Sequence, residues 1–545
     1  MKNTSLAVDD NGAERFDYVI VGSGAAGSIL ANRLSADGST VCLLEAGPPD
    51  NNPFLHIPAG FIKAVFNPKY AWQFSTEATD KTNGRRIPIP QGRTLGGSTS
   101  INGLVYNRGQ HADFDHWASL GNEGWAYKDV LPYFKSMEKR VGGDDYYRGR
   151  TGELPVTDID WIHPICEAFI QGAVEQGIPK NPDYNGADQA GVGYFQRTIH
   201  NGWRMSTAKT FLKPARSRSN LAVKTYAQAT RILFKDKQAI GVAYVHPLHP
   251  SQAGKVMAIK EVIIACGAIN TPKLLQLSGI GPAAYLQERN IAVIQDLPGV
   301  GENLSDHYSV RVVAQVKNGE TMNELVKGMK LGGQIFKWLT KRPSIMALSP
   351  SLIHYFWKSS PDLLSPDLQG VFTPASYKEG YVGLLDDFPG MTAGVWQHRP
   401  ESKGYVKIKS SDPFEDPIIQ PNYLEHPDDQ QALIRGIRLA RKLLQSKSLE
   451  QYFHKETLPG ELCQSDDELL DFAKKFGVSS YHVTGTARMG PSSDKSAVVD
   501  RELRVYGVQN LRVVDSSIMP SIPSANVCAA TMMIANKAAE LIRGK

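Results

Sequence analysis

Apolar runs and glycine-rich turns alternate in a regular order near the start of the chain. Residues 17–21 are mostly apolar, residues 22–27 contain three glycines, residues 28–34 place apolar side chains at helical spacing, and a second apolar run follows at 40–44. This order predicts a buried strand, a tight turn, a helix that begins near residue 25 and a second strand.

The same order returns in the middle of the chain. An apolar run at 261–266 leads through Gly267 into a helical pattern that ends at Gly279. Pro272 is expected in the first turn of this helix, where its missing N–H costs little. Other elements are expected as helices at 129–137, 428–445 and 525–543, a helix after the Ser465 capping box, and a strand at 511–515.

Residues 310–425 differ in composition from these segments. They mix aromatic, proline and serine residues with strand-like pieces such as 404–409, which predicts a second, β-rich sheet with connecting helices. A chain of 545 residues has room for two to four domains. The expected fold class is therefore α/β, with an α+β second domain.

The three glycines of the first turn each have a physical role. Gly22 allows the tight turn, Gly24 lets the backbone approach a pyrophosphate, and Gly27 lets helix and strand pack closely. The free N–H groups of the following helix face the phosphate charge. Glu45, 18 residues after Gly27, is placed to accept hydrogen bonds from an adenosine ribose. The sequence thus predicts a dinucleotide site.

Composition and charge narrow the class of protein. The net charge is +5, with 41% apolar and 21% charged residues, and no basic tract supports nucleic-acid binding. Five scattered cysteines fit a reducing compartment and imply no metal site, and His246 and His249 are interpreted as surface residues. With no apolar signal core and no run of about 20 apolar residues, a cytoplasmic protein is expected. A peripheral contact with the inner membrane face stays open.

Three long motifs make the prediction specific. They start at Gly92 (G-R-T-L-G-G-S-T-S-I-N), at Gly267 (G-A-I-N-T-P-K-L-L-Q-L-S-G-I-G) and at Tyr481 (Y-H-V-T-G-T-A-R-M-G). Together with residues 514–526 they closely resemble, in order, the signatures of the glucose–methanol–choline (GMC) oxidoreductases. The resemblance runs from about residue 16 to the end of the chain and is strongest to choline dehydrogenase-like and flavin alcohol dehydrogenases.

The resemblance implies FAD as the cofactor, held by a Rossmann-like domain. It places the first-turn glycines and Glu45 on the adenosine half, and Val223 on the adenine side. It places the Gly96–Asn102 loop beside the isoalloxazine and pyrophosphate, and Asp515 near the ribityl and phosphate region. The cofactor residues expected from it are Gly22, Ser23, Gly24, Ala25, Ala26, Gly27, Glu45, Ala46, Arg93, Gly96, Gly97, Ser98, Asn102, Gly103, Val223, Cys266, Gly267, Asp515 and Asn526.

Covalent attachment of the flavin is not expected. Family members that bind FAD through a histidine carry it where this chain has Ile101. The flavin is therefore predicted to be non-covalent.

The resemblance also implies the catalytic pair. His482 corresponds to the family's base and Asn526 to its partner. A neutral imidazole can take the hydroxyl proton of an alcohol while the hydride leaves the carbinol carbon, and the amide can hold the developing alkoxide. Trp396 and His398 alternate on one predicted strand and, with Tyr481, are candidates for the substrate pocket.

The two domains are expected to interleave along the chain. The FAD-binding domain is assigned to 16–48, 90–110, 210–310 and 480–545, the substrate-binding domain to 49–89, 111–209 and 311–479, and residues 1–15 to a flexible N-terminal extension.

The expected function is the FAD-dependent oxidation of a primary aliphatic or aromatic alcohol to its aldehyde, an activity on CH–OH groups. Choline dehydrogenase and an oxygen-using alcohol oxidase are the alternatives, and a flavin-dependent lyase or decarboxylase ranks below them because His398 aligns with the decarboxylases' reactive cysteine. The expected partners are an alcohol and an electron acceptor, whether quinone, carrier or oxygen. The sequence leaves open which alcohol is used, which acceptor is natural and how the chain oligomerises.

Overall fold

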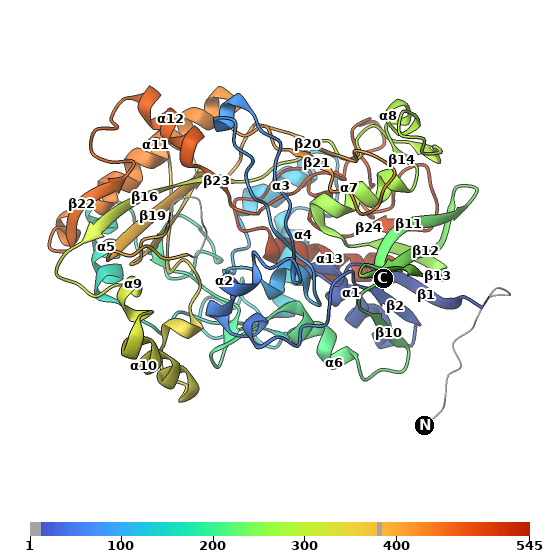
Figure 1. Cartoon of the computed structure of the whole chain (residues 1–545), viewed down its shortest axis with the longest axis horizontal. Coiled ribbons are helices and arrows are strands. Elements are labelled where there is room, and N and C mark those ends of the chain that lie inside the picture. Colours follow the sequence, from blue (N-terminus) through green and yellow to red (C-terminus); the bar gives the residue numbers. More distant parts are fainter. Residues whose placement is uncertain (1–11, 379–383, 545) are drawn as a thin grey trace.

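The chain folds around two seven-stranded sheets, each with its own hydrophobic core (Figure 1). The computed structural model describes residues 12–378 and 384–544. Short two-stranded ribbons and loops connect the two sheets. This arrangement agrees with the α/β class and the β-rich second domain that the sequence predicts.

The first sheet joins segments from both ends of the chain. Its order is β10-β2-β1-β13-β12-β11, and β24 pairs with the end of β13. Parallel pairing links β10, β2, β1, β13 and β24, whereas β11, β12 and β13 form an antiparallel meander. The strands are β1 (Glu14–Val21), β2 (Val41–Leu44), β10 (Leu221–Lys224), β11 (Gln228–Lys235), β12 (Gln238–His246), β13 (His249–Ile264) and β24 (Leu511–Val513).

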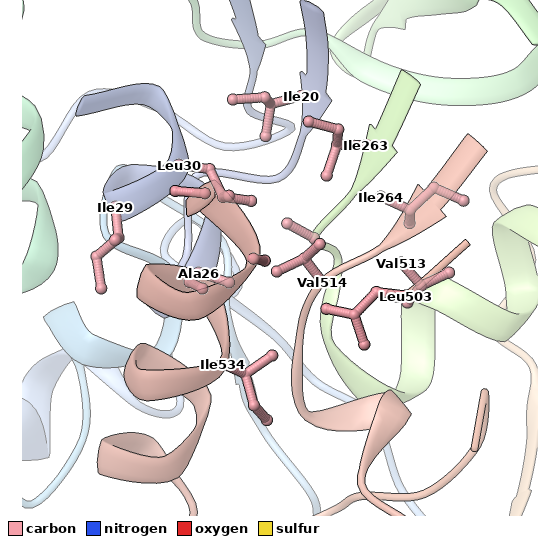
Figure 2. Close-up of a cluster of buried hydrophobic side chains, with 14 of the residues drawn as sticks. Ile20, Ala26, Ile29, Leu30, Ile263, Ile264, Leu503, Val513, Val514 and Ile534 are labelled. Carbon is pink, nitrogen blue, oxygen red and sulfur yellow. The ribbon is translucent and has the colours of Figure 1, made fainter. Parts of the chain in front are cut away.

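Helices α1 (Ala25–Leu34) and α13 (Cys528–Arg543) pack together against this sheet. Figure 2 shows Leu30 of α1 near Ile20 and Ile263 of the strands, and Ile534 of α13 lower in the same cluster. Because both faces of the parallel strands are buried, their sequences are continuously apolar rather than alternating. The helix predicted to start near residue 25 is confirmed. The last helix begins at Cys528, three residues later than expected, and so leaves Asn526 outside it.

Helix α7 (Gly267–Leu277) follows β13, as predicted, but the place expected for Pro272 is wrong. The helix begins at Gly267, so Pro272 lies inside it rather than in its first turn. Proline cannot supply the N–H that would bond the carbonyl of Ala268. That carbonyl instead accepts a hydrogen bond of 2.6 Å from the Thr486 hydroxyl, which ties α7 to the C-terminal motif.

The segment 111–209 does not belong wholly to the second domain. Helices α3 (His111–Ser119) and α4 (Tyr127–Met137) contribute Trp117 and Phe134 to the core of the first sheet, and the Trp117 indole donates to the Ser521 carbonyl. At the N-terminus, β1 already begins at Glu14, and the rest of the expected extension, residues 1–11, lies outside the described residues.

The second sheet is antiparallel, in the order β22-β16-β19-β18-β17-β7, with β23 paired to β16. Helix α11 covers one face (Figure 1), and Ser465 and Glu468 form the predicted capping box of α12. The elements are β7 (Gly191–Tyr194), β16 (Tyr308–Val316), β17 (Ile353–Trp357), β18 (Leu368–Thr373), β19 (Gly390–Gln397), β22 (Phe453–Leu458), β23 (Val478–Ser479), α5 (Pro164–Glu175), α11 (Pro427–Leu444) and α12 (Asp466–Phe476).

The strand expected at 404–409 forms as β20, but in a ribbon with β21 beside α7 rather than in the second sheet. The ribbons are β3 (Ala71–Trp72) with β4 (Gln91–Gly92), β5 (Glu138–Arg140) with β6 (Leu154–Val156), β8 (Ile199–His200) with β9 (Trp203–Arg204), β14 (Ile280–Gly281) with β15 (Gln295–Asp296), and β20 (Tyr405–Lys407) with β21 (Ile418–Gln420). The other helices are α2 (Phe61–Ala64), α6 (Lys213–Ala215), α8 (Ala283–Gln287), α9 (Met322–Leu325) and α10 (Gly328–Leu339).

Candidate active site

A cavity of about 420 Å³ extends from the first sheet to the second. At the first sheet its wall is the glycine turn 22–26 together with Glu45. At the second sheet its wall includes Tyr481, His482 and Asn526. One cavity therefore joins the nucleotide turn to the predicted catalytic pair.

Backbone rather than side chains forms the wall at the turn. Gly24 is the N-cap of α1 and gives its first turn no side-chain hydrogen bond, so the N–H groups there are available to an anion. Gly97 adopts a φ of +51°, and a Cβ on it would lie only 2.7 Å from the Gly24 Cα atom. A Cβ at Gly267 would meet no atom within 4 Å. These bare backbone surfaces form a cradle that fits a dinucleotide.

Glu45 is buried and partly satisfied by its own loop. Its carboxylate accepts hydrogen bonds from the Ser23 N–H (3.1 Å), the Ser23 hydroxyl (2.5 Å) and the Gly47 N–H (2.9 Å). Burial raises its pKa, and these hydrogen bonds oppose the rise. Since a carboxylate has about four acceptor positions, one position stays available for a ribose hydroxyl.

Asp515 connects the C-terminal segment to α7. Its carboxylate accepts hydrogen bonds from the Gly267 N–H (2.9 Å) and the Thr271 hydroxyl (2.6 Å) at the start of that helix. It also accepts one from the Ser517 N–H (2.8 Å). Burial raises its pKa, and the hydrogen bonds oppose the rise. Asp515 lines the cavity, where sequence reasoning expected it.

Most of the residues predicted from the sequence lie on the cavity wall. Those that line it are Gly22, Ser23, Gly24, Ala25, Ala26, Glu45, Ala46, Gly97, Ser98, Asn102, Gly103, Cys266, Gly267, Asp515, Asn526, His482, Tyr481 and Trp396.

Three predicted residues support the cofactor end from behind its wall. At Gly27 a Cβ would overlap the Gly22 carbonyl oxygen, so this glycine permits the close packing of helix on turn. Gly96 has a φ of +86° and precedes the wall residue Gly97. The Arg93 guanidinium stacks 4.3 Å from the ring centroid of Trp72, and Trp72 itself lines the cavity.

Val223 and His398 were predicted to contact the cofactor and the substrate, but neither residue lines the cavity. Val223 lies on β10, paired with Leu43 and packed against the first core, while residues 227–229 form the cavity wall there. His398 follows the last residue of β19, so the alternation with Trp396 does not reach it. Its side chain is fully buried, with its ring 5.8 Å from that of Phe356, and it does not line the cavity.

The catalytic pair is in direct contact. The Asn526 Nδ2 atom lies 3.0 Å from the His482 Nε2 atom. The Asn526 Oδ1 atom accepts a 3.2 Å hydrogen bond from Gln369 of β18, so the NH₂ group faces the imidazole. Two segments 44 residues apart thus meet at the second sheet.

His307, which sequence reasoning did not single out, contacts the other side of the His482 ring. The two Nδ1 atoms are 2.9 Å apart, and the His307 Nε2 atom lies 2.7 Å from the carbonyl oxygen of His398. The neighbouring Asp306 carboxylate accepts the backbone N–H of His482 at 2.7 Å. An Asp-His dipeptide just before a strand gives no hint of this contact, because its partner is 175 residues away.

The backbone carbonyl of His398 determines the protonation pattern. A carbonyl only accepts, so the His307 Nε2 atom must carry a proton. In neutral His307 the Nδ1 atom is then an acceptor, and the His482 Nδ1 atom must donate to it. The His482 Nε2 atom therefore carries the lone pair, which accepts a hydrogen bond from the Asn526 Nδ2–H group and faces the cavity.

Burial keeps these imidazoles neutral. It holds the pKa of His482 well below 6.5, and a proton on the neighbouring His307 would lower the pKa of His482 further. It lowers the pKa of His307 to about 4. It also raises the pKa of Asp306 to about 6, although four hydrogen bonds to that carboxylate favour the ionised form. A neutral base with its lone pair toward the cavity is the result.

The substrate half of the cavity, formed by β16, β18, β19 and residues 479–482, is mainly apolar. The Trp396 indole N–H is buried without a hydrogen-bond partner among the described residues. Arg311 also lines this half, and burial lowers its pKa. Within the described part of this half, no Asp or Glu lines the cavity.

The structure as described holds no cluster of three or more His, Cys, Asp or Glu side chains arranged for a metal. His246 and His249 face each other on the β12–β13 hairpin, with ring centroids 4.9 Å apart. None of the helices in the described ranges is long and apolar enough to cross a membrane.

Comparisons with known proteins agree on one family. Two GMC oxidoreductase family models match residues 16–309 and 400–535. An "Alcohol dehydrogenase [acceptor]" of Pseudomonas putida is 40% identical over 533 residues, covering 97% of this chain and 95% of the relative. An "Oxygen-dependent choline dehydrogenase" of Brucella anthropi is also 40% identical, covering 97% and 96%. The crystal structure of pyridoxine 4-oxidase from Mesorbium loti superimposes with a TM-score of 0.88 at 29% identity, covering 97% of this chain and 99% of that one.

Proposed function

The chain belongs to the GMC oxidoreductase family, and we propose that it oxidises a neutral primary alcohol to the aldehyde with His482 as the base. It is an FAD-dependent oxidoreductase that acts on CH–OH groups. The observation that carries the proposal is the lone pair of His482 Nε2, which faces the cavity and accepts the Asn526 amide N–H at 3.0 Å.

The cavity wall assigns parts of the cofactor to parts of the chain. The N-terminus of α1 with Gly24 would hold the pyrophosphate, Glu45 the ribose, and residues 227–229 the adenine. The wall residues 97–99 and 101–103, together with Asp515, would hold the flavin ring and ribityl chain.

The catalytic pair would act on the hydroxyl group from two sides. A substrate hydroxyl that takes the place of the Asn526 amide at Nε2 would donate its proton to that lone pair, and its oxygen would accept the Nδ2–H that Nε2 accepts in this structure. As the proton moves to Nε2, the Asn526 amide stabilises the negative charge on oxygen. FAD held by the cavity wall would supply the acceptor for the hydride of the carbinol carbon, so that loss of the proton to His482 and of the hydride to the flavin would give the aldehyde.

The lining of the substrate half favours a neutral alcohol over choline. A quaternary ammonium is best held by an aromatic cage with a carboxylate nearby, and no Asp or Glu lines the described part of this half. The Trp396 indole N–H, which has no hydrogen-bond partner among the described residues, offers a hydrogen bond to an oxygen of a neutral substrate.

An anaerobic screen tests the proposal. The holoenzyme is mixed without oxygen with choline and with aliphatic, benzylic, furanic and polyether alcohols, and flavin bleaching and aldehyde are measured. We expect neutral primary alcohols to bleach the flavin and choline to do so far more slowly. Fastest reduction by choline would reject the preference for neutral alcohols, and no reduction by any alcohol would reject the function itself.

The flavin is expected to dissociate from the denatured chain. Ile101 lines the cavity where covalent family members carry histidine, and His482 is the only histidine among the described wall residues. Acid precipitation should leave all the yellow colour in the supernatant. Colour that stays with the precipitated polypeptide would contradict a non-covalent flavin.

The pH dependence should reflect the buried base. Protonation of His482 abolishes its lone pair, and burial disfavours the protonated form, so the base stays neutral below pH 6.5. Protonation of Asp306, with a pKa near 6, would weaken the hydrogen bond to the His482 backbone. We therefore expect kcat/KM for an alcohol to fall on the acid side only at about pH 6 or lower. A decline centred above pH 6.5 would contradict this.

A further inference from the structure

Helix α10 (Gly328–Leu339) exposes large apolar side chains along one face. Met329 is 95% exposed, Phe336 is 61% exposed and Leu339 is 65% exposed. Phe336 follows Met329 by seven residues and Leu339 follows Phe336 by three, so the three side chains share a face of the helix. Single exposed apolar residues are ordinary, but a contiguous row on one helix indicates a partner.

The inner side of the helix is firmly attached, so this exposure does not come from a loose helix. The Gln334 side chain is buried, and its Oε1 atom accepts a hydrogen bond from the Ile345 N–H at 3.2 Å. The backbone carbonyl of Gln334 accepts one from the Ser344 hydroxyl at 2.7 Å. The Trp338 indole donates to the Gly202 carbonyl at 2.8 Å and packs edge-on against Trp203. These contacts hold α10, which lies at the edge of the molecule in Figure 1, in a fixed orientation with its apolar face exposed.

Cations surround this face. Between Glu324 and Asp362 the chain carries no acidic residue. Two nearby carboxylates are already paired, Glu320 with Lys330 at 2.7 Å and Asp387 with Lys378 at 3.5 Å. The cations in and next to the helix are Lys327, Lys330, Lys337, Lys341 and Arg342, and Lys209 lies over the Trp203 ring.

We propose that α10 docks this molecule on an anionic lipid bilayer, with Met329, Phe336 and Leu339 among the acyl chains and the flanking lysines at the headgroups. An apolar stripe bordered by lysines, with tryptophans at its edge, is typical of helices that lie in the membrane interface. Negative headgroups attract the surrounding cations. In a symmetric contact with a second copy, by contrast, the cations around the helix would face the same cations.

The position of α10 gives the docking a functional consequence. The turn η7 (Ile345–Ala347) packs between α10 and the turn η3 (Pro58–Gly60). Pro350, just after η7, and Phe61, just after η3, both line the cavity. Docking through α10 would bring this part of the cavity wall toward the bilayer, from which a lipid-dissolved alcohol or electron acceptor could enter.

Vesicle binding of the full-length holoenzyme tests the proposal. It is sedimented with vesicles of phosphatidylcholine alone or mixed with phosphatidylglycerol, alongside the double variant Phe336→Glu, Leu339→Glu. The matched control is Leu462→Glu. Leu462 is 94% exposed and belongs to the segment between β22 and α12, two elements that lie apart from α10 in Figure 1. We expect the parent and the control to bind the anionic vesicles, with weaker binding at high salt, and the double variant to bind at least about tenfold less.

The proposal would be overturned if the parent binds neither kind of vesicle, or if the double variant binds as the control does. If, in that second case, the double substitution also splits a dimer in light scattering, a second copy is the partner of α10. Flavin reduction by a water-soluble alcohol, measured without vesicles, should be unchanged in the variant, so this test is independent of the proposed function.

Discussion

Replacing His482 by alanine should lower alcohol turnover by about 10²–10⁴-fold while the flavin stays bound. General-base assistance is typically worth that factor, which corresponds to about 3–5 kcal/mol of activation free energy. His482 lines the cavity at the end opposite Gly24, so the cofactor contacts at the nucleotide end are untouched. The measurements are the rate of anaerobic flavin reduction and the flavin content of the purified variant.

A second histidine substitution provides the control. His246→Ala removes an imidazole from the β12–β13 hairpin, away from the cavity wall, and should leave turnover unchanged. If His482→Ala reduces flavin within a few-fold of the parent rate, His482 is not the base. A fall in turnover that only matches a loss of flavin would show a structural role instead.

His307→Leu should lower kcat/KM by about 10–100-fold, although His307 is separated from the cavity by His482. Leucine leaves the buried His482 Nδ1–H without its acceptor, so the ring can turn or carry its proton on Nε2 instead. A base in the wrong tautomer cannot take the hydroxyl proton, as removal of the orienting group of a catalytic triad illustrates. His307 is therefore a positioning residue.

His307→Asn separates positioning from packing. Its amide can present an oxygen to the His482 Nδ1–H, so it should recover much of the activity that leucine loses, and the acid side of the pH profile should shift in the leucine variant alone. Equal losses in both variants, with an unchanged pH profile, would show that His307 only fills space. Melting temperatures and flavin contents of the two variants control for misfolding.

The sequence predicted the parts of the fold that local patterns determine. Helix α1 begins at Ala25, where the glycine turn placed it, and Ser465 caps α12 through the expected box. The wall residues of the nucleotide turn could be predicted because the spacing of Gly22, Gly24 and Gly27 constrains backbone geometry directly.

The remaining features depend on contacts between distant segments. Pro272 lies inside α7 because Thr486, far along the chain, satisfies the carbonyl that proline leaves free. His398 does not reach the cavity because β19 ends one residue before it. The contact of His307 with His482 joins the start of β16 to the C-terminal motif, and no local pattern encodes it.

One measurement tests the central claim most directly: a single anaerobic turnover in which aldehyde formed and flavin reduced are counted together. If His482 removes the hydroxyl proton while the carbinol hydride moves to FAD, a neutral primary alcohol should give one aldehyde per reduced flavin. The rate of that turnover should fall when His482 is protonated or replaced. The account would be contradicted by a flavin that dithionite reduces but no alcohol does.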